Sequence, residues 1–307
     1  MPAPSPLRLA RYSFRAAQVL TALAPGPFFG RIMRSGRGVE TRCVLSFDCD
    51  FPRDVNALPE LVDLLAEYDC SASFALIGRW VRAFPEEHRL LVEAGHEIVN
   101  HTETHPNLYH PDYYYAREEG LSREFFNRLD RAGRRYEIAT AHATIAEVLG
   151  TEPVGFRTPH FGALHVDDVY GILAELGYVF SSSVPASAHG ARPYVTDEGI
   201  WEIPVSPCPR HPMGVFDSWH SIGKCNAAHA EPGQLSGLFA ELLAAARAEG
   251  GLVNVYFDPL AALESGELRR MLEMLKGESI PVALYADLCN QWSGGIERAG
   301  ALQDFAL

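Results

Sequence analysis

The stretch Cys43-Val44-Leu45-Ser46-Phe47-Asp48-Cys49-Asp50 is an apolar run that ends in two carboxylates one residue apart. A near-continuous apolar run is typical of a strand that is covered on both faces, as in a parallel sheet. Further along the chain, His101-Thr102-Glu103-Thr104-His105 follows a second short apolar run. Carboxylates and imidazoles at strand ends are the ligands and proton carriers of metal-assisted hydrolases.

Segments that fit strands alternate with segments of helical periodicity along most of the chain. This alternation predicts βαβ units and a parallel sheet. We expect strands at residues 42–47, 72–77, 97–100, 154–157, 178–181, 200–205, 252–257 and 282–285. We expect helices at residues 57–69, 86–94, 121–149, 166–176, 235–246 and 266–276.

This order of elements predicts an α/β fold, a distorted or incomplete (β/α) barrel of about seven to eight parallel strands. An open doubly wound sheet is the alternative, although no glycine fingerprint of the GxGxxG or GxxxxGK[ST] kind favours nucleotide binding. We expect three parts: an N-terminal helical extension over residues 1–40, the barrel over residues 41–295 and a C-terminal tail over residues 296–307.

The composition is that of an ordinary globular protein and restricts its partners. Of 307 residues, 47% are hydrophobic and 21% are charged, which excludes a largely disordered chain. The formal net charge of −13 argues against a nucleic-acid partner. The six cysteines include no CxxC pair and indicate buried free thiols rather than a disulfide framework.

The N-terminal segment mixes basic and apolar residues. Over residues 7–30, arginines alternate with leucines and aromatic residues. This pattern predicts either a helix packed on the domain or an amphipathic helix on a membrane surface. Neither a signal peptide nor a run of about 18 apolar residues is evident. We therefore expect a cytoplasmic protein, with peripheral contact to the inner membrane face through residues 7–30 as an alternative.

Polar side chains recur where the expected strands end. They are Asp48, Asp50, His101, His105, Arg157, His160 and Asp258. In a β/α barrel, functional residues cluster at this edge. Two imidazoles and one carboxylate hold a divalent metal and leave positions open for water and substrate. The spacing of His101 and His105 suits one turn of helix, which would aim both rings the same way.

These residues resemble the motifs of the NodB-type polysaccharide deacetylases, carbohydrate esterase family 4. The family's first motif, TFDDG-like, is similar to residues 46–50, and its second, H-[ST]-x-x-H, is matched by residues 101–105. The third motif, R-x-P, is matched by residues 157–159, and the sequence GHEI at residues 95–98 is also typical of the family. The resemblance extends from residue 43 to about residue 290.

The resemblance implies a metal-dependent hydrolase that removes an N-acyl group, with acetyl expected, from an amino sugar or glycan. Asp48 would be the general base, and Arg157 would hold it ionised and oriented. Asp50, His101 and His105 would bind one divalent metal, which would be zinc, with cobalt or nickel as alternatives.

The chain departs from the family at the histidine that protonates the leaving amine. Asp258 stands where that histidine is expected, after the seventh strand. A carboxyl group can serve as this acid only if burial or nearby negative charge raises its pKa. The other candidate donors are His160, His211 and His220. Cys49 also departs from the first motif, at a position to which the family assigns no chemistry.

The aromatic-rich loops are expected to contact the substrate, because aromatic rings stack on sugar faces as well as packing in cores. The candidate substrate-binding residues are Tyr113, Pro159, His160, Trp219 and His220. Two other functions fit the same residues. One is an amidase acting on a non-carbohydrate C–N bond, and the other is a catalytically impaired carbohydrate-binding barrel. The sequence makes no prediction of the oligomeric state.

Overall fold

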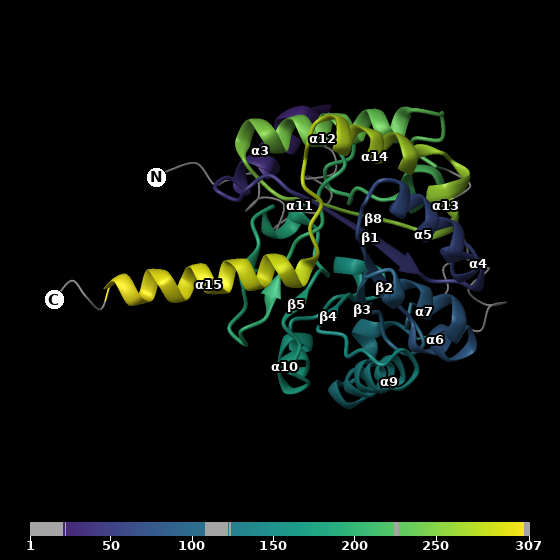
Figure 1. Ribbon diagram of the computed structural model, residues 1–307. Coiled ribbons are helices and arrows are strands. Elements are labelled where there is room, and N and C mark those ends of the chain that lie inside the picture. Colours follow the sequence, from purple (N-terminus) through teal and green to yellow (C-terminus); the bar gives the residue numbers. More distant parts are fainter. Residues whose placement is uncertain (1–20, 22, 108–121, 123, 224–226, 304–307) are drawn as a thin grey trace.

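A curled sheet of eight strands lies at the centre of the computed structural model (Figure 1), which describes residues 21, 23–107, 122, 124–223 and 227–303. The strand order is β6-β7-β5-β4-β3-β2-β1-β8, and all neighbouring pairs are parallel except β6 and β7. The strands are β1 (Cys43–Cys49), β2 (Ser73–Leu76), β3 (Glu97–Asn100), β4 (Gly155–Phe156), β5 (Phe180–Ser181), β6 (Tyr194–Val195), β7 (Trp201–Glu202) and β8 (Val253–Phe257).

Helices surround this sheet. In Figure 1, α12 and α14 lie along the top of the molecule, α6, α7 and α9 lie below the sheet, and α15 extends to the left away from the body. The helices are α3 (Pro25–Ser35), α4 (Pro52–Asn56), α5 (Leu58–Glu67), α6 (Gly78–Ala83), α7 (Pro85–Glu93), α9 (Arg131–Leu149), α10 (Asp168–Glu175), α11 (Ala186–His189), α12 (Gln234–Glu249), α13 (Pro259–Glu264), α14 (Glu267–Gly277) and α15 (Tyr285–Gln303). Proline stands in the first turn of α3, α4, α5, α7 and α13, where its missing N–H leaves no hydrogen bond unmade.

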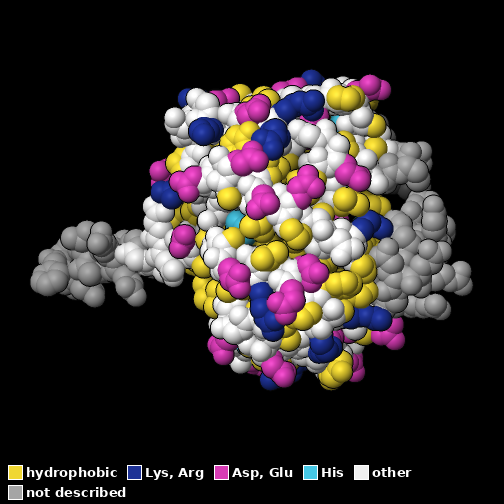
Figure 2. Space-filling view, turned by 45° about the vertical axis from the view of Figure 1, so that its right-hand side comes forward, with side chains coloured by type: hydrophobic (Ala, Val, Ile, Leu, Met, Phe, Trp, Pro, Cys, Tyr) yellow, Lys and Arg dark blue, Asp and Glu magenta, His cyan; other side chains and the backbone are white. Residues whose placement is uncertain are grey.

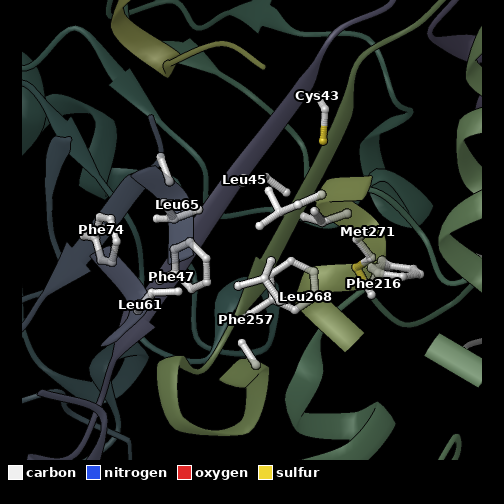
Figure 3. Packing of buried hydrophobic residues seen from close by; sticks show 14 of the residues in the cluster. Cys43, Leu45, Phe47, Leu61, Leu65, Phe74, Phe216, Phe257, Leu268 and Met271 are labelled. Atoms are coloured by element: carbon white, nitrogen blue, oxygen red, sulfur yellow. The ribbon is translucent and has the colours of Figure 1, made fainter. Parts of the chain in front are cut away.

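The two faces of β1 have different environments, because successive side chains of a strand point in opposite directions. Leu45 and Phe47 belong to the largest hydrophobic cluster, which packs against α5 and α14 (Figure 3). The Phe47 ring stacks on Phe74 of β2, with 5.0 Å between ring centroids. The opposite face carries Ser46 and Asp48, both of which contact Arg157 inside the barrel. Thus one strand builds the outer core and also presents polar groups to the interior.

The segment after β7 crosses to β8 and narrows the opening between the two ends of the sheet. The Ser206 amide donates to the Asn254 carbonyl at 2.8 Å, and Asp217 forms an isolated parallel bridge with Tyr256. The side-chain amide of Asn254 donates to the carbonyl of Ile203 at 3.0 Å. The predicted α/β fold, an incomplete and distorted (β/α) barrel of mostly parallel strands, is confirmed.

Two predicted elements differ from the structure. The strand expected at residues 282–285 is wrong: Val282 forms only an isolated bridge with Cys43, and Tyr285 begins α15. The Glu97 carboxylate accepts the backbone amides of Tyr285 and Ala286 at 3.1 and 2.8 Å, and so starts this helix.

The helix expected from residue 121 begins at Arg131, because Asp130 caps it by accepting the Gly133 amide at 2.7 Å. The short antiparallel strand β6 was not predicted.

The N-terminal region is described from residue 23 and at residue 21, so most of the segment 7–30 lies outside the described residues. Within α3, Phe29 and Met33 join the largest core cluster, and Ile32 packs against Ala186 and Ala191. None of the described helices has the length and apolarity that crossing a bilayer requires. The division at residues 40 and 295 stays a prediction.

Gly78, the first residue of α6, tests the contact between α6 and α9. A Cβ there would lie 2.9 Å from the Ala141 Cα and would also meet the Glu103 carboxylate. We expect Gly78→Ala to lower the free energy of unfolding by about 1–3 kcal/mol in urea denaturation, because backbone cannot move aside as a side chain can. Gly237, in α12 with nothing within 4 Å of its added Cβ, is the control. Gly237→Ala should stabilise by about 0.5–1 kcal/mol. Equal urea denaturation midpoints for the wild type and Gly78→Ala would contradict the close packing of α6 against α9.

We expect the buried His88 to make the stability of the protein depend on pH. Its side chain is fully buried in α7, its Nδ1 lies 2.7 Å from the Phe84 carbonyl, and burial lowers its pKa to about 4. An unfolded histidine has a pKa of about 6.5, so the unfolded state binds more protons between these values. Stability should therefore fall as pH drops from about 6.5 to about 4.

His88→Asn keeps a donor for the Phe84 carbonyl but cannot titrate in this range. Its free energy of unfolding should depend less steeply on pH, by at most about 1.4 kcal/mol per pH unit. Urea denaturation at pH 4.5, 5.5, 6.5 and 8 measures the difference. Identical slopes for the two proteins would show that His88 does not contribute.

Candidate active site

The carboxyl ends of β1 and β3 bring Asp50, His101 and His105 together. The Asp50 Oδ1 lies 3.4 Å from the His101 Nε2 and 3.5 Å from the His105 Nε2. Ligand bonds of about 2.0–2.2 Å at tetrahedral angles place neighbouring donor atoms roughly 3.3–3.6 Å apart. The Asp50 Oδ1 and the His105 Nε2 are buried without a hydrogen-bond partner. This donor set therefore fits one divalent cation.

The protonation states of Asp50 and His105 also suit metal binding, whereas the hydrogen bond with Asp50 and the charge of Asp48 outweigh burial and raise the pKa of His101. Burial opposes ionisation of Asp50, but His105 and His101 outweigh it and lower the Asp50 pKa to about 2. Burial lowers the pKa of His105 to about 4, so its imidazole is neutral at pH 7. The His101 Nδ1 lies 2.8 Å from the Arg157 carbonyl, which accepts its proton and leaves Nε2 facing Asp50.

The helical turn predicted for residues 101–105 is wrong, although both rings do point to one place. Thr102 and His105 have φ values of 71° and 51°, which an α-helix does not allow. Asn100 Oδ1 accepts the Thr102 amide at 2.8 Å, and Thr102 Oγ1 accepts the His105 amide at 3.1 Å. Two further residues with positive φ, His160 at 57° and Phe161 at 49°, follow β4. Left-handed backbone at residues with side chains is strained, and here it accompanies the metal ligands.

Asp48 and Arg157 form a buried ion pair beside these ligands. The Arg157 Nη1 donates to the Asp48 Oδ1 at 2.6 Å, and the Asp48 Oδ2 lies 4.0 Å from the His101 Nε2. Both side chains are almost inaccessible to solvent. Burial raises the pKa of Asp48 above its ordinary value, and the Arg157 guanidinium and His101 oppose that rise. The expectation that Arg157 would hold Asp48 ionised and oriented did not include the desolvation of the carboxylate, which is the largest effect on its pKa.

The other two nitrogen atoms of the Arg157 guanidinium group also donate hydrogen bonds. Its Nη2 donates to the hydroxyls of Ser46 at 2.9 Å and Tyr285 at 2.7 Å, and its Nε donates to the Ser182 carbonyl at 3.2 Å. The guanidinium also lies 5.6 Å from the centre of the Tyr256 ring. Ser182 and Tyr285 were not predicted as site residues, because no local pattern marks an interior hydroxyl.

Comparison with known proteins agrees with this geometry. A family model described as polysaccharide deacetylase matches residues 36–181. The resemblance to the NodB-type polysaccharide deacetylases is confirmed. This match includes Asp48, Asp50, His101, His105 and Arg157.

Two curated relatives match over shorter segments. A chitooligosaccharide deacetylase of Sinorhizobium fredii is 43% identical over 77 residues, which are 25% of this chain and 34% of that protein. A peptidoglycan-N-acetylglucosamine deacetylase of Bacillus cereus is 36% identical over 74 residues, 24% of this chain and 26% of that protein. The chain thus spans about a third of the length of the first of these relatives and a quarter of the second.

Solved structures share the fold over a larger part of the chain. A protein of Mycobacterium smegmatis assigned to the polysaccharide deacetylases superposes with a TM-score of 0.65 and 20% identity, covering 83% of this chain and 90% of that one. PuuE allantoinase superposes with a TM-score of 0.63 and 11% identity, covering 83% and 91%. At these identities the likeness concerns the fold alone.

Asp258, where the resemblance places a histidine, stands at the N-cap position of α13, makes no capping hydrogen bond through its side chain and is buried. Ser218 Oγ donates to its Oδ2 at 2.7 Å and accepts its amide at 2.6 Å. Burial and the negative charges of Asp54 and Asp50 raise the pKa of Asp258 well above its ordinary range. Burial also raises the pKa of Asp54 to about 7. Residue 258 is therefore a carboxyl that holds its proton far more readily than a free aspartate.

His220 lies on the π-helical segment η4 (Trp219–Gly223) and is the best oriented of the other histidines. Its Nδ1 lies 2.8 Å from the Asp217 Oδ2, and its side chain is about half exposed. His220 shares a cavity of about 690 Å³ with His160 and Tyr256. His160 also contributes to the lowered pKa of Asp50.

The other candidate residues are distributed differently. Trp219 and Asp258 line a second cavity of about 630 Å³. Pro159, which lies between Arg157 and His160 in the sequence, is buried. Tyr113 lies outside the described residues. His211 does not line the cavity of His220, and its ring lies 5.1 Å from that of His229.

A double-mutant cycle tests the Asp48–Arg157 pair. Removing one partner leaves the other charge buried without compensation, so Arg157→Met and Asp48→Asn should each lower the free energy of unfolding by about 3–5 kcal/mol. The double variant should lose less than the sum of the single losses, by roughly 1–3 kcal/mol, since neither charge then remains. Urea denaturation at pH 7 measures all four proteins. Strict additivity of the two single effects would contradict the coupling.

Proposed function

We propose that the chain is a metal-dependent deacetylase that hydrolyses the N-acetyl amide of an amino sugar within a glycan. The observation that carries the proposal is the convergence of Asp50, His101 and His105 beside the buried Asp48–Arg157 pair. The match of residues 36–181 to the polysaccharide deacetylases supports it, as do the two curated relatives. Those relatives act on chitooligosaccharides and on peptidoglycan by name, so a glycan of N-acetylated amino sugars is the proposed substrate class.

Asp50, His101 and His105 would hold the metal, with zinc proposed first and cobalt or nickel as alternatives. When bound, such a cation supplies positive charge that polarises the amide carbonyl and acidifies water. His101 is fixed for this role by its hydrogen bond to the Arg157 carbonyl. Because Asp50 is ionised and His105 is neutral, neither residue must lose a proton before it binds.

Asp48 is the proposed general base. Its Oδ1 is occupied by Arg157, whereas its Oδ2 faces the metal ligands. A base works best when its pKa approaches the working pH, and burial moves the Asp48 pKa in that direction. Arg157 fixes the carboxylate so that the free oxygen accepts the proton of the attacking water.

Asp258 is the proposed acid that protonates the leaving amine, with His220 as the alternative. The raised pKa of Asp258 keeps a proton available near neutral pH, and Ser218 fixes the carboxyl group. His220 is oriented by Asp217 and shares a cavity with His160. Trp219, in the cavity of Asp258, offers an aromatic face for a sugar ring.

Acetate release from N-acetylglucosamine oligomers tests the proposal. Protein purified without chelators should release acetate, lose this activity after chelation and regain it with zinc, cobalt or nickel. His105→Gln should remove one equivalent of bound metal and abolish turnover, because the triad then lacks a ligand. Allantoin and a simple N-acetyl amide serve as non-carbohydrate substrates, and binding without turnover would favour the carbohydrate-binding alternative. A protein that holds metal at this triad but hydrolyses no glycan would overturn the proposal.

Matched variants in the same assay distinguish whether Asp258 or His220 protonates the leaving amine. Asp258→Asn should lower kcat by roughly 10²–10⁴, the usual contribution of a general acid, while His220→Gln should have a small effect. The reverse pattern assigns the role to His220. A cytoplasmic location, and membrane contact through residues 7–30, remain predictions from the sequence.

A further inference from the structure

A second group of metal-binding side chains lies outside the proposed active site. Cys208, His211 and His229 place one donor atom each within 4.8 Å of one another. The Cys208 Sγ lies 3.6 Å from the His229 Nε2, and both side chains are buried. The His211 ring lies 5.1 Å from the His229 ring, and His211 is exposed. None of these residues takes part in the proposed reaction.

The separation of Cys208 and His229 fits a tetrahedral centre. Zinc binds thiolate sulfur at about 2.3 Å and imidazole nitrogen at about 2.0–2.1 Å, which at a tetrahedral angle places the two donors roughly 3.6 Å apart. This is the distance between the Cys208 Sγ and the His229 Nε2. The exposure of His211 leaves the fourth position open to water.

The backbone around Cys208 favours the binding of a cation by its sulfur atom. Cys208-Pro209-Arg210-His211 is a Cys-x-x-His turn, and the backbone amides of Arg210 and His211 are directed at the Cys208 sulfur. N–H groups directed at a sulfur atom stabilise the thiolate, which is the form that binds metals.

We propose that Cys208, His211 and His229 form a second metal site that takes zinc or a cation of similar softness. The thiol proton is released when the cation binds, and the fourth ligand is water. Its one sulfur and two nitrogen donors distinguish it from Asp50, His101 and His105, which offer one oxygen and two nitrogens.

The site joins the two ends of the segment that carries His220 and Ser218, the hydrogen-bond partner of Asp258. Cys208 and His211 precede Asp217, Ser218 and η4, and His229 follows them. Within this segment the His229 amide donates to the Ser221 carbonyl at 2.8 Å. A cation on the three residues would fix the ends of the segment whose Ser218 holds Asp258. The site is therefore structural, and it positions the segment rather than the reacting atoms.

Cobalt substitution tests the proposal without any activity measurement. A cobalt–thiolate bond absorbs in the near ultraviolet, whereas the oxygen and nitrogen donors of the active-site triad give no such band. We expect the full chain to bind two equivalents of Co²⁺ and to show this band. His211→Gln, at an exposed position that folding tolerates, should weaken the band and the affinity, and Cys208→Ala should abolish the band together with one equivalent of metal.

Two controls separate this site from the triad and from other thiols. His105→Gln should lose one equivalent of Co²⁺ but keep the band, and Cys70→Ala should keep both. In thermal denaturation, Zn²⁺ should raise the Tm of His105→Gln but not that of His105→Gln combined with His211→Gln. A wild-type chain without the thiolate band, or Cys208→Ala with unchanged metal content, would overturn the second site and leave the deacetylase proposal intact.

Discussion

The buried ion pair between Arg157 and Asp48 is the constraint on which the interior of the barrel depends. A guanidinium removed from water costs several kcal/mol unless its donors find partners. Here the partners come from separate parts of the chain: Asp48 from β1, Ser182 from the residues after β5, and Tyr285 from the start of α15. One side chain therefore fixes the relative positions of three elements. The backbone of Arg157 also fixes the orientation of the His101 ring, because its carbonyl accepts the His101 Nδ1 proton.

This arrangement gives the two faces of β1 different roles near its carboxyl end. The residues of β1 that face α5 and α14 are Leu45 and Phe47, while Ser46 and Asp48 face inward (Figure 3). The surface in Figure 2 shows acidic and basic side chains interspersed, with no large region of one sign. On this face the charges are mixed, whereas at the strand ends inside the barrel the buried charges of Asp48 and Arg157 lie beside the proposed metal ligands.

Features that local sequence patterns encode could be predicted from the sequence. Apolar runs located β1, β2, β3 and β8, and the motifs located the triad. Features set by distant contacts were missed. Residues 282–285 are as apolar as a strand, but the Glu97 carboxylate starts α15 there. The His101–His105 spacing suggested a helix, but the Asn100 side chain and the φ of Thr102 replace it with a strained loop. Cys208 and His229 are 21 residues apart, a spacing that no short motif describes.

The replacement of a histidine by Asp258 is understandable from the charges around it. An imidazole has an ordinary pKa of about 6.5 and holds its proton near neutrality without help, whereas an aspartate starts from about 3.9. Asp258 is buried near Asp54, Asp50 and Asp48, all of which raise its pKa. Carboxylates would also raise the pKa of an imidazole, but an imidazole starts much closer to neutrality and needs them less. A carboxyl group holds a proton near neutrality only with such help, so the acidic surroundings of Asp258 agree with its proposed role as the acid.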